Sequence, residues 1–239
     1  MKTIISLKKV NPHLILLCLS VFMFQACSKK IEQHQTNNKD YAAEKLGRIR
    51  IYNVDSIIFN INTGFGKPYD TIRFLEKHEI KEIRKDQTGK DYFYILVSTN
   101  EINNLFQEKY AYKSQLSNID FQKTIDNQKK IALIFPAIFN KTWDANLYNN
   151  SKNEQKYRYV VSDEMINQSR IYADQIIVRK KKEILPITES FANFEIYAKD
   201  TGMVYSLDYY INIQQKQDGT TFYEEQIGYK IIRQLIDFK

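Results

Sequence analysis

The sequence predicts an all-β fold, an antiparallel meander that forms a curled sheet, a sandwich or a half-barrel. The clearest observation is the segment 205–214, YSLDYYINIQ, in which every odd position is apolar and most even positions are polar. This period of two is typical of a strand with one buried face. Asp218 and Gly219 follow it with residues that suit a tight hairpin turn. Similar segments rich in Ile, Val, Tyr and Phe recur from Gly47 onward, which is typical of an all-β domain.

The other expected strands follow one another along the chain, most of them separated by turn residues. The segment 92–97, YFYILV, is apolar at both parities, so we expect a central strand covered on both faces. The segment 69–84 also has an apolar spacing that suits a helix. In 222–238 the apolar residues change parity, which a bulge near Ile231 or a short terminal helix would explain. The expected strands lie at 48–61, 69–84, 91–99, 105–114, 119–125, 130–135, 157–161, 171–181, 191–198, 205–214 and 222–238.

Residues 1–26 have the pattern of a secretory signal peptide. Lysines without any acidic residue precede an apolar run at 14–24, which is too short for a membrane-spanning helix of about 20 residues. Residues 24–27, Phe-Gln-Ala-Cys, resemble a bacterial lipobox. This resemblance implies that Cys27 begins the mature chain and that its sulfur carries a diacylglycerol. The alternative is an ordinary secreted protein with a cysteine near the cleavage site.

The segment 27–46 is polar, so we expect a flexible tether before a single β-rich domain at 47–239. Ser28 and two lysines follow Cys27 in place of the acidic cluster that marks surface export in similar lipoproteins. We therefore expect a lipid anchor in the outer membrane, facing the periplasm. Loss of the three signal-peptide lysines lowers the formal net charge from +7 to +4. The expected partners are the membrane and either an envelope protein or an apolar ligand, and nucleic acid is not among them.

The numbers of cysteines and histidines argue against several kinds of site. Cys18 would leave with the signal peptide and Cys27 would be acylated, so the mature chain would lack a disulfide, a zinc-binding thiolate and a cysteine nucleophile. Of 3 histidines, only His78 lies in the expected domain. A multi-histidine metal site and a Ser-His-Asp triad are therefore not expected, and we predict no metal and no cofactor.

Several short motifs resemble a known family. They are Tyr-Asn-Val-Asp-Ser-Ile at 52–57, Phe-Pro at 135–136, Trp-x-x-Asn at 143–146 and YAKDTGMVY at 197–205. They are similar to motifs of uncharacterised outer-membrane lipoproteins of Bacteroidetes-type bacteria, and the resemblance covers most of 47–239. Such proteins tend to carry a tryptophan before the Val-Asp-Ser strand, where this chain has Ile-Arg-Ile. The resemblance implies no activity, cofactor or catalytic residue.

Trp143, Asn146 and Tyr148 are the candidate ligand contacts. An aromatic platform beside an amide suits a sugar or a peptide. The alternative is structural, with Trp143 plugging one end of the sheet and Asn146 bonding to the backbone of its loop.

Three further stretches have both a functional and a structural interpretation. The basic run at 179–182, Arg-Lys-Lys-Lys, suits lipid headgroups or a solvated strand end. The residues Asp-Thr-Gly at 200–202 predict a turn in which Gly202 supplies a backbone angle forbidden to other residues. Ser56 and Thr71 each follow an aspartate and precede an isoleucine, a pattern at which similar envelope proteins are O-glycosylated.

The sequence therefore predicts a lipid-anchored envelope lipoprotein with a non-catalytic binding or scaffolding role. It has no nucleophile elbow, phosphate-binding glycine loop or metal-ligand spacing. The alternative is a hydrolase acting on envelope glycans, for which the carboxylates of Asp55, of 163–164 and of 224–225 are candidates. Neighbours in a strand face opposite sides, so Glu224 and Glu225 should not share a cleft.

Overall fold

A computed structural model describes most of the expected domain. The described residues are 38–59, 69–100, 105–149, 153–161, 172, 174–180, 189–218 and 221–239, with the backbone alone for 189, 190, 214–218 and 221–226. The predicted signal peptide, Cys27 and the tether up to residue 37 lie outside these residues, so the predicted anchor stays a prediction.

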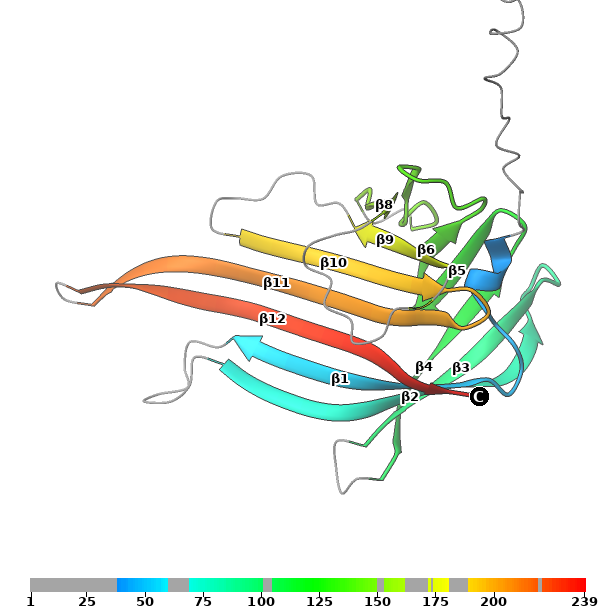
Figure 1. Cartoon of the computed structure of the whole chain (residues 1–239), viewed down its shortest axis with the longest axis horizontal. Helices are drawn as coiled ribbons and strands as arrows, with labels where there is room; N and C mark the ends of the chain where they lie inside the picture. The colour runs from blue at the N-terminus through cyan, green and yellow to red at the C-terminus, as the bar shows by residue number, and fades with distance from the viewer. Residues whose placement is uncertain are drawn as a thin grey trace, which may run out of the picture. The chain divides into compact units, whose positions relative to one another are not determined.

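The described residues form one antiparallel sheet of twelve strands (Figure 1), which confirms the all-β antiparallel prediction. No α-helix occurs in this part of the chain. The strands are β1 (Ile49–Phe59), β2 (Tyr69–Lys85), β3 (Asp91–Thr99), β4 (Gln107–Leu116), β5 (Asp120–Ile125), β6 (Gln128–Ile134), β7 (Thr142–Asp144), β8 (Lys156–Val160), β9 (Gln175–Lys180), β10 (Glu189–Ala198), β11 (Gly202–Asp218) and β12 (Thr221–Phe238).

The strand order shows two meanders joined at the middle of the sheet. The order is β6-β5-β4-β3-β2-β1-β12-β11-β10-β9-β8-β7. The chain enters at β1, reaches one edge at β6, crosses to the other edge at β7 and returns to pair β12 with β1. In Figure 1, β3 to β6 run steeply across the ends of β1, β2 and β10 to β12. The sheet is thus curled, as predicted.

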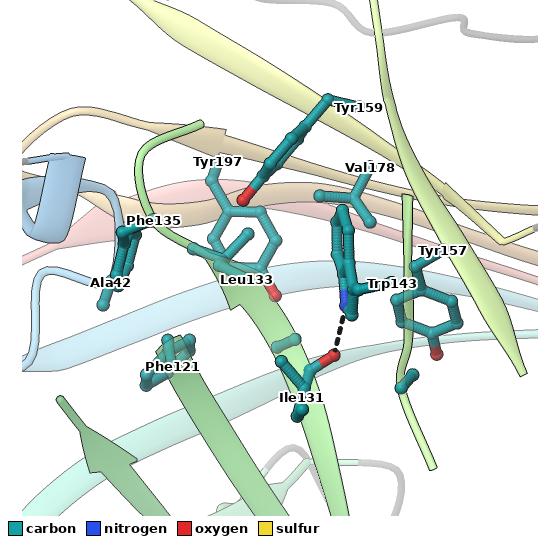
Figure 2. Close-up of a cluster of buried hydrophobic side chains, with 12 residues drawn as sticks. Ala42, Phe121, Ile131, Leu133, Phe135, Trp143, Tyr157, Tyr159, Val178 and Tyr197 are labelled. Atoms are coloured by element: carbon teal, nitrogen blue, oxygen red, sulfur yellow. Dashed lines mark hydrogen bonds between the residues drawn. The ribbon is translucent and has the colours of Figure 1, made fainter. Parts of the chain in front are cut away.

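The two edges of the sheet meet, so the curl is nearly closed. The backbone N–H of Ile131, on β6, donates a hydrogen bond to the carbonyl of Ala145, just after β7, at 2.9 Å. The indole Nε1 of Trp143 donates to the carbonyl of Ile131, also at 2.9 Å (Figure 2). These bonds join the end of one meander to the start of the other.

The ends and irregularities of several strands differ from the prediction. The segment 69–84 lies in strand β2 and 222–238 lies in strand β12, so both helix alternatives are wrong. No register shift occurs near Ile231, and the irregularity lies at Ile236, where β12 pairs with β1. Strand β3 is buried at both parities only over Val97–Thr99, because its other half is partly exposed.

The folded part begins earlier than the predicted boundary at Gly47. Residues Asn38–Tyr41 form the 3-10 turn η1. Ala42 is only 2% exposed, and its carbonyl accepts a hydrogen bond from the guanidinium of Arg50 at 3.3 Å. The backbone N–H of Asp200 donates to the carbonyl of Asp40 at 2.9 Å. The segment 38–46 therefore packs against the sheet, so the flexible-tether prediction is wrong for these residues.

The turn between β10 and β11 has the predicted conformation. Asp200 and Gly202 have φ values of 59° and 90°, a region that glycine adopts without steric cost. An added Cβ at Gly202 would also lie 2.8 Å from Nη2 of Arg50. Both the backbone angle and the close approach of Arg50 therefore require glycine here.

Candidate functional site

The inner, concave face of the sheet encloses two adjoining cavities. The first, which we call the arginine cavity, has a volume of about 190 Å³ and is lined by residues that include Arg50, His78, Glu44 and Arg233. The second, the lysine cavity, has a volume of about 350 Å³ and includes Lys130, Lys180 and Asp208. Lys123, Ile125 and Glu195 line both cavities.

Strand register explains why charged residues from distant parts of the chain meet here. Alternate residues of a strand share one face. Tyr52 on β1 pairs with Glu76 on β2, and Val54 pairs with Arg233 on β12. Ser206 on β11 pairs with Arg233, and Glu195 on β10 pairs with Ser206. All of these residues therefore point to the concave side.

The first charged cluster links Arg233, Glu76, His78 and Tyr112. Arg233 Nε donates to Oε1 of Glu76 at 2.8 Å, and His78 Nε2 lies 2.8 Å from the same oxygen. His78 Nδ1 lies 3.2 Å from the Tyr112 hydroxyl. Because the carboxylate only accepts hydrogen bonds, Nε2 carries the proton and Nδ1 accepts from Tyr112.

This cluster fixes the charges of its members. Burial acts to raise the pKa of Glu76, but the hydrogen bond from His78 and the positive charge of Arg233 outweigh it and lower that pKa to about 2. Burial lowers the pKa of His78 despite the opposing effect of Glu76. At neutral pH the cluster therefore holds one carboxylate, one guanidinium and a neutral imidazole.

A second cluster stands between the two cavities. Lys123 Nζ donates to the Tyr197 hydroxyl at 2.9 Å and lies 3.6 Å from Oε2 of Glu195. The Tyr197 hydroxyl donates to the same carboxylate oxygen. Burial opposes ionisation of Glu195, but the charge of Lys123 and the Tyr197 hydrogen bond hold its pKa below the ordinary value.

The third charged pair is Glu44 with Arg50. Their closest atoms, Arg50 Nη1 and Glu44 Oε1, lie 3.6 Å apart and both side chains are buried. Arg50 also donates to the carbonyls of Thr201 at 2.9 Å and Ala43 at 2.7 Å. Burial raises the pKa of Glu44 despite Arg50, and its Oε2 has no hydrogen-bond partner. Glu44 thus brings an unsatisfied polar atom to the arginine cavity.

Trp143, Asn146 and Tyr148 do not gather on one open platform. Trp143 is 9% exposed and packs between the rings of Tyr157 and Tyr159, with centroids at 5.9 and 4.8 Å (Figure 2). Asn146 Nδ2 donates to the backbone carbonyl of residue 153 at 2.8 Å. Tyr148 is 47% exposed. These placements favour the structural interpretation, in which Trp143 is core and Asn146 holds its loop.

The other sequence candidates are scattered. Arg179 and Lys180 lie on β9 over the rings of Phe194 and Phe191, and the rest of that basic run lies outside the described residues. Ser56 lies inside β1, and Thr71 is exposed on β2. Residues 163–164 and the side chains of 224–225 are not described. In the described ranges, no group of three or more His, Cys, Asp or Glu could hold a metal ion, and no helix has the length and hydropathy of a membrane span.

The charged cavities were not predicted, although the sequence contains a signal for them. Arg50 has the same parity as the buried Tyr52 and Val54, and Glu76 and His78 have the same parity as the buried Ile80. A charged residue at a core-facing position of a strand must find a partner inside the fold.

A scan against family models, a search of curated proteins and a search of solved structures each gave no match to this chain. The family resemblance therefore stays a prediction.

Proposed function

We propose that the chain is a lipid-anchored envelope protein that binds a small ligand on the concave face of its sheet without transforming it. The observation that carries this proposal is the pair of adjoining cavities lined by ionic clusters. Replacing a buried ion pair by apolar residues of similar volume is often neutral or stabilising. Stability alone thus does not account for three charged clusters that line two cavities, whereas recognition of a polar ligand does.

The anchor places this cavity at a membrane. The lipobox-like residues 24–27 and the preceding basic and apolar segments support acylation of Cys27. By the resemblance described above, the membrane is the outer membrane and the domain faces the periplasm.

Cys27→Ser should abolish incorporation of a radiolabelled fatty acid into the protein and release it from the membrane fraction, because the mature chain has no other cysteine thiol that could be acylated. Cys18→Ser is the matched control and should leave both labelling and fractionation unchanged. Equal labelling of wild type and Cys27→Ser would contradict the proposed anchor.

The second candidate function is hydrolysis of envelope glycans, and one observation favours it. A glycosidase needs one protonated and one ionised carboxyl group. Glu44 and Glu195 line the same cavity, and their pKa values are shifted in opposite directions, upward for Glu44 and downward for Glu195. Each, however, is ion-paired to a cation, Arg50 or Lys123.

Incubation of the protein with isolated envelope glycans separates the two functions. If the wild-type protein releases reducing ends from the glycans and the Glu195→Gln variant does not, the protein is a hydrolase. The binding protein should release none above the level of a heat-denatured sample.

A further inference from the structure

We propose that the ligand is amphipathic, a single-chain lipid whose zwitterionic phosphate-ammonium headgroup occupies the lysine cavity and whose acyl chain lies along an adjoining apolar strip. This inference rests on the proposed function and names the class of ligand. Two observations carry it, namely the mixed charge of the lysine cavity and an exposed apolar extension of the same concave face.

The lysine cavity carries both signs of charge in equal number. Lys123, Lys130 and Lys180 line it together with three carboxylates, those of Asp126, Glu195 and Asp208. A purely basic cavity would select a simple anion. Lysines bind phosphate as point charges, and carboxylates nearby accept hydrogen bonds from an ammonium group. A headgroup that carries both charges matches this lining.

The apolar strip continues the concave face beyond the cavities. It runs toward the first residues of β2 and β12 and toward the last residues of β1 and β11. Cross-strand partners form rows across the sheet. In one row, Arg233 on β12 pairs with Val54 on β1 and Ser206 on β11. In the next row, Ile231 pairs with Ser56 and Asp208. Asp208 lines the lysine cavity. The strip therefore begins beside that cavity. Its apolar members are Phe74, Ile72, Ile58, Ile231, Tyr229 and Tyr210; Ser56 lies among them, and Asp70 and Asp208 border them on β2 and β11.

These residues share one face because no register shift interrupts the strands between them. Ile72, Ile58 and Tyr229 are 47%, 44% and 38% exposed. Two residues of a strand advance about 6.7 Å, so the two rows beyond Arg233 extend the concave face by about 13 Å. An exposed apolar surface that adjoins a charged cavity has the polarity pattern of a lipid, with its headgroup at one end and its chain at the other.

The test uses native mass spectrometry of the mature lipoprotein in a non-ionic detergent. Three probes are compared at equal concentration: a lysophosphatidylethanolamine with one saturated chain, glycerophosphoethanolamine as the headgroup alone, and the matching fatty acid as the chain alone. The lysolipid should bind one to one and at least roughly tenfold more tightly than either fragment, since each buried methylene adds affinity.

Variants locate the binding site. Ile72→Asn should weaken lysolipid binding roughly tenfold and leave headgroup binding unchanged. Ile83→Asn is the matched control, because Ile83 is 46% exposed on the same strand but lies at its far end, and it should change neither. Lys130→Met should weaken both the lysolipid and the headgroup.

Equal affinity for the lysolipid and the headgroup would overturn the lipid inference and leave the proposed binding function intact. A doubled protein mass that Ile72→Asn abolishes would assign the strip to a second copy of the chain and also overturn it. Tighter binding of the fatty acid than of the lysolipid would overturn the inference that the ligand has a zwitterionic headgroup. A different result would contradict the proposed binding function itself: protein purified from its own envelope that retains no small molecule.

Discussion

Glu76→Gln should destabilise the protein by about 3–5 kcal/mol at pH 7, as measured by urea unfolding. The substitution removes the negative charge that Arg233 and His78 share at 2.8 Å. The guanidinium of Arg233 would then stay largely buried without its counter-charge, which is the costly outcome for a buried ion pair.

The matched control lies on the same strand. Glu82 forms an ion pair with Arg84, but both side chains are almost half exposed. Glu82→Gln should therefore change stability by less than about 1 kcal/mol. Equal effects of the two substitutions would show that the Glu76 cluster contributes no more than a surface pair.

The pH dependence of this effect has a definite sign. The pKa of Glu76 is about 2 in the folded protein against an ordinary 4.5. Its stabilising contribution, about 3 kcal/mol by linkage, is present above pH 4.5 and is lost as the pH falls toward 2. The difference in unfolding free energy between wild type and Glu76→Gln should therefore shrink between pH 5 and pH 3. A constant difference would contradict the lowered pKa.

Trp143→Ala should destabilise the protein by about 3–5 kcal/mol. The indole is buried between two tyrosine rings and bonds to the carbonyl of Ile131. Its loss opens a cavity where the sheet edges meet and leaves that carbonyl unpaired. Thermal and urea unfolding measure the change.

Tyr148→Ala is the control for Trp143→Ala. Tyr148 is 47% exposed and makes one long hydrogen bond, of 3.3 Å, to Asp120. Its removal should cost less than about 1 kcal/mol. An unchanged melting curve for Trp143→Ala would instead indicate a surface aromatic platform.

Local sequence signals predicted most of the strands because strand alternation and turn chemistry act over a few residues. The period of two at 205–214 falls within β11, and Asp218 pairs with Thr221 as a tight hairpin requires. Gly202 has the positive φ expected of it. These features depend on neighbours in sequence, so the sequence alone suffices.

Features that depend on strand pairing between distant parts of the sequence were not predicted. Arg233 and Glu76 are 157 residues apart, and only the pairing of β12 with β1 and of β1 with β2 brings them together. The structural interpretation of Trp143 placed it at one end of the sheet, but its partner Ile131 follows only from the meeting of the sheet edges. Glu44 was expected in the polar tether because the segment 27–46 offers little apolar surface, and its pairing with the buried Arg50 depends on how that segment packs against the sheet.

The most direct test of the account is chemical analysis of what the protein holds when it is purified from its own cell envelope. Wild type and Lys123→Met, each shown by its melting curve to be folded, are denatured, and the released small molecules are identified by mass spectrometry. We expect about one molecule for each wild-type chain and much less for the variant, because Lys123 lines both cavities. Release of nothing above background from wild type, or of equal amounts from both proteins, would contradict it.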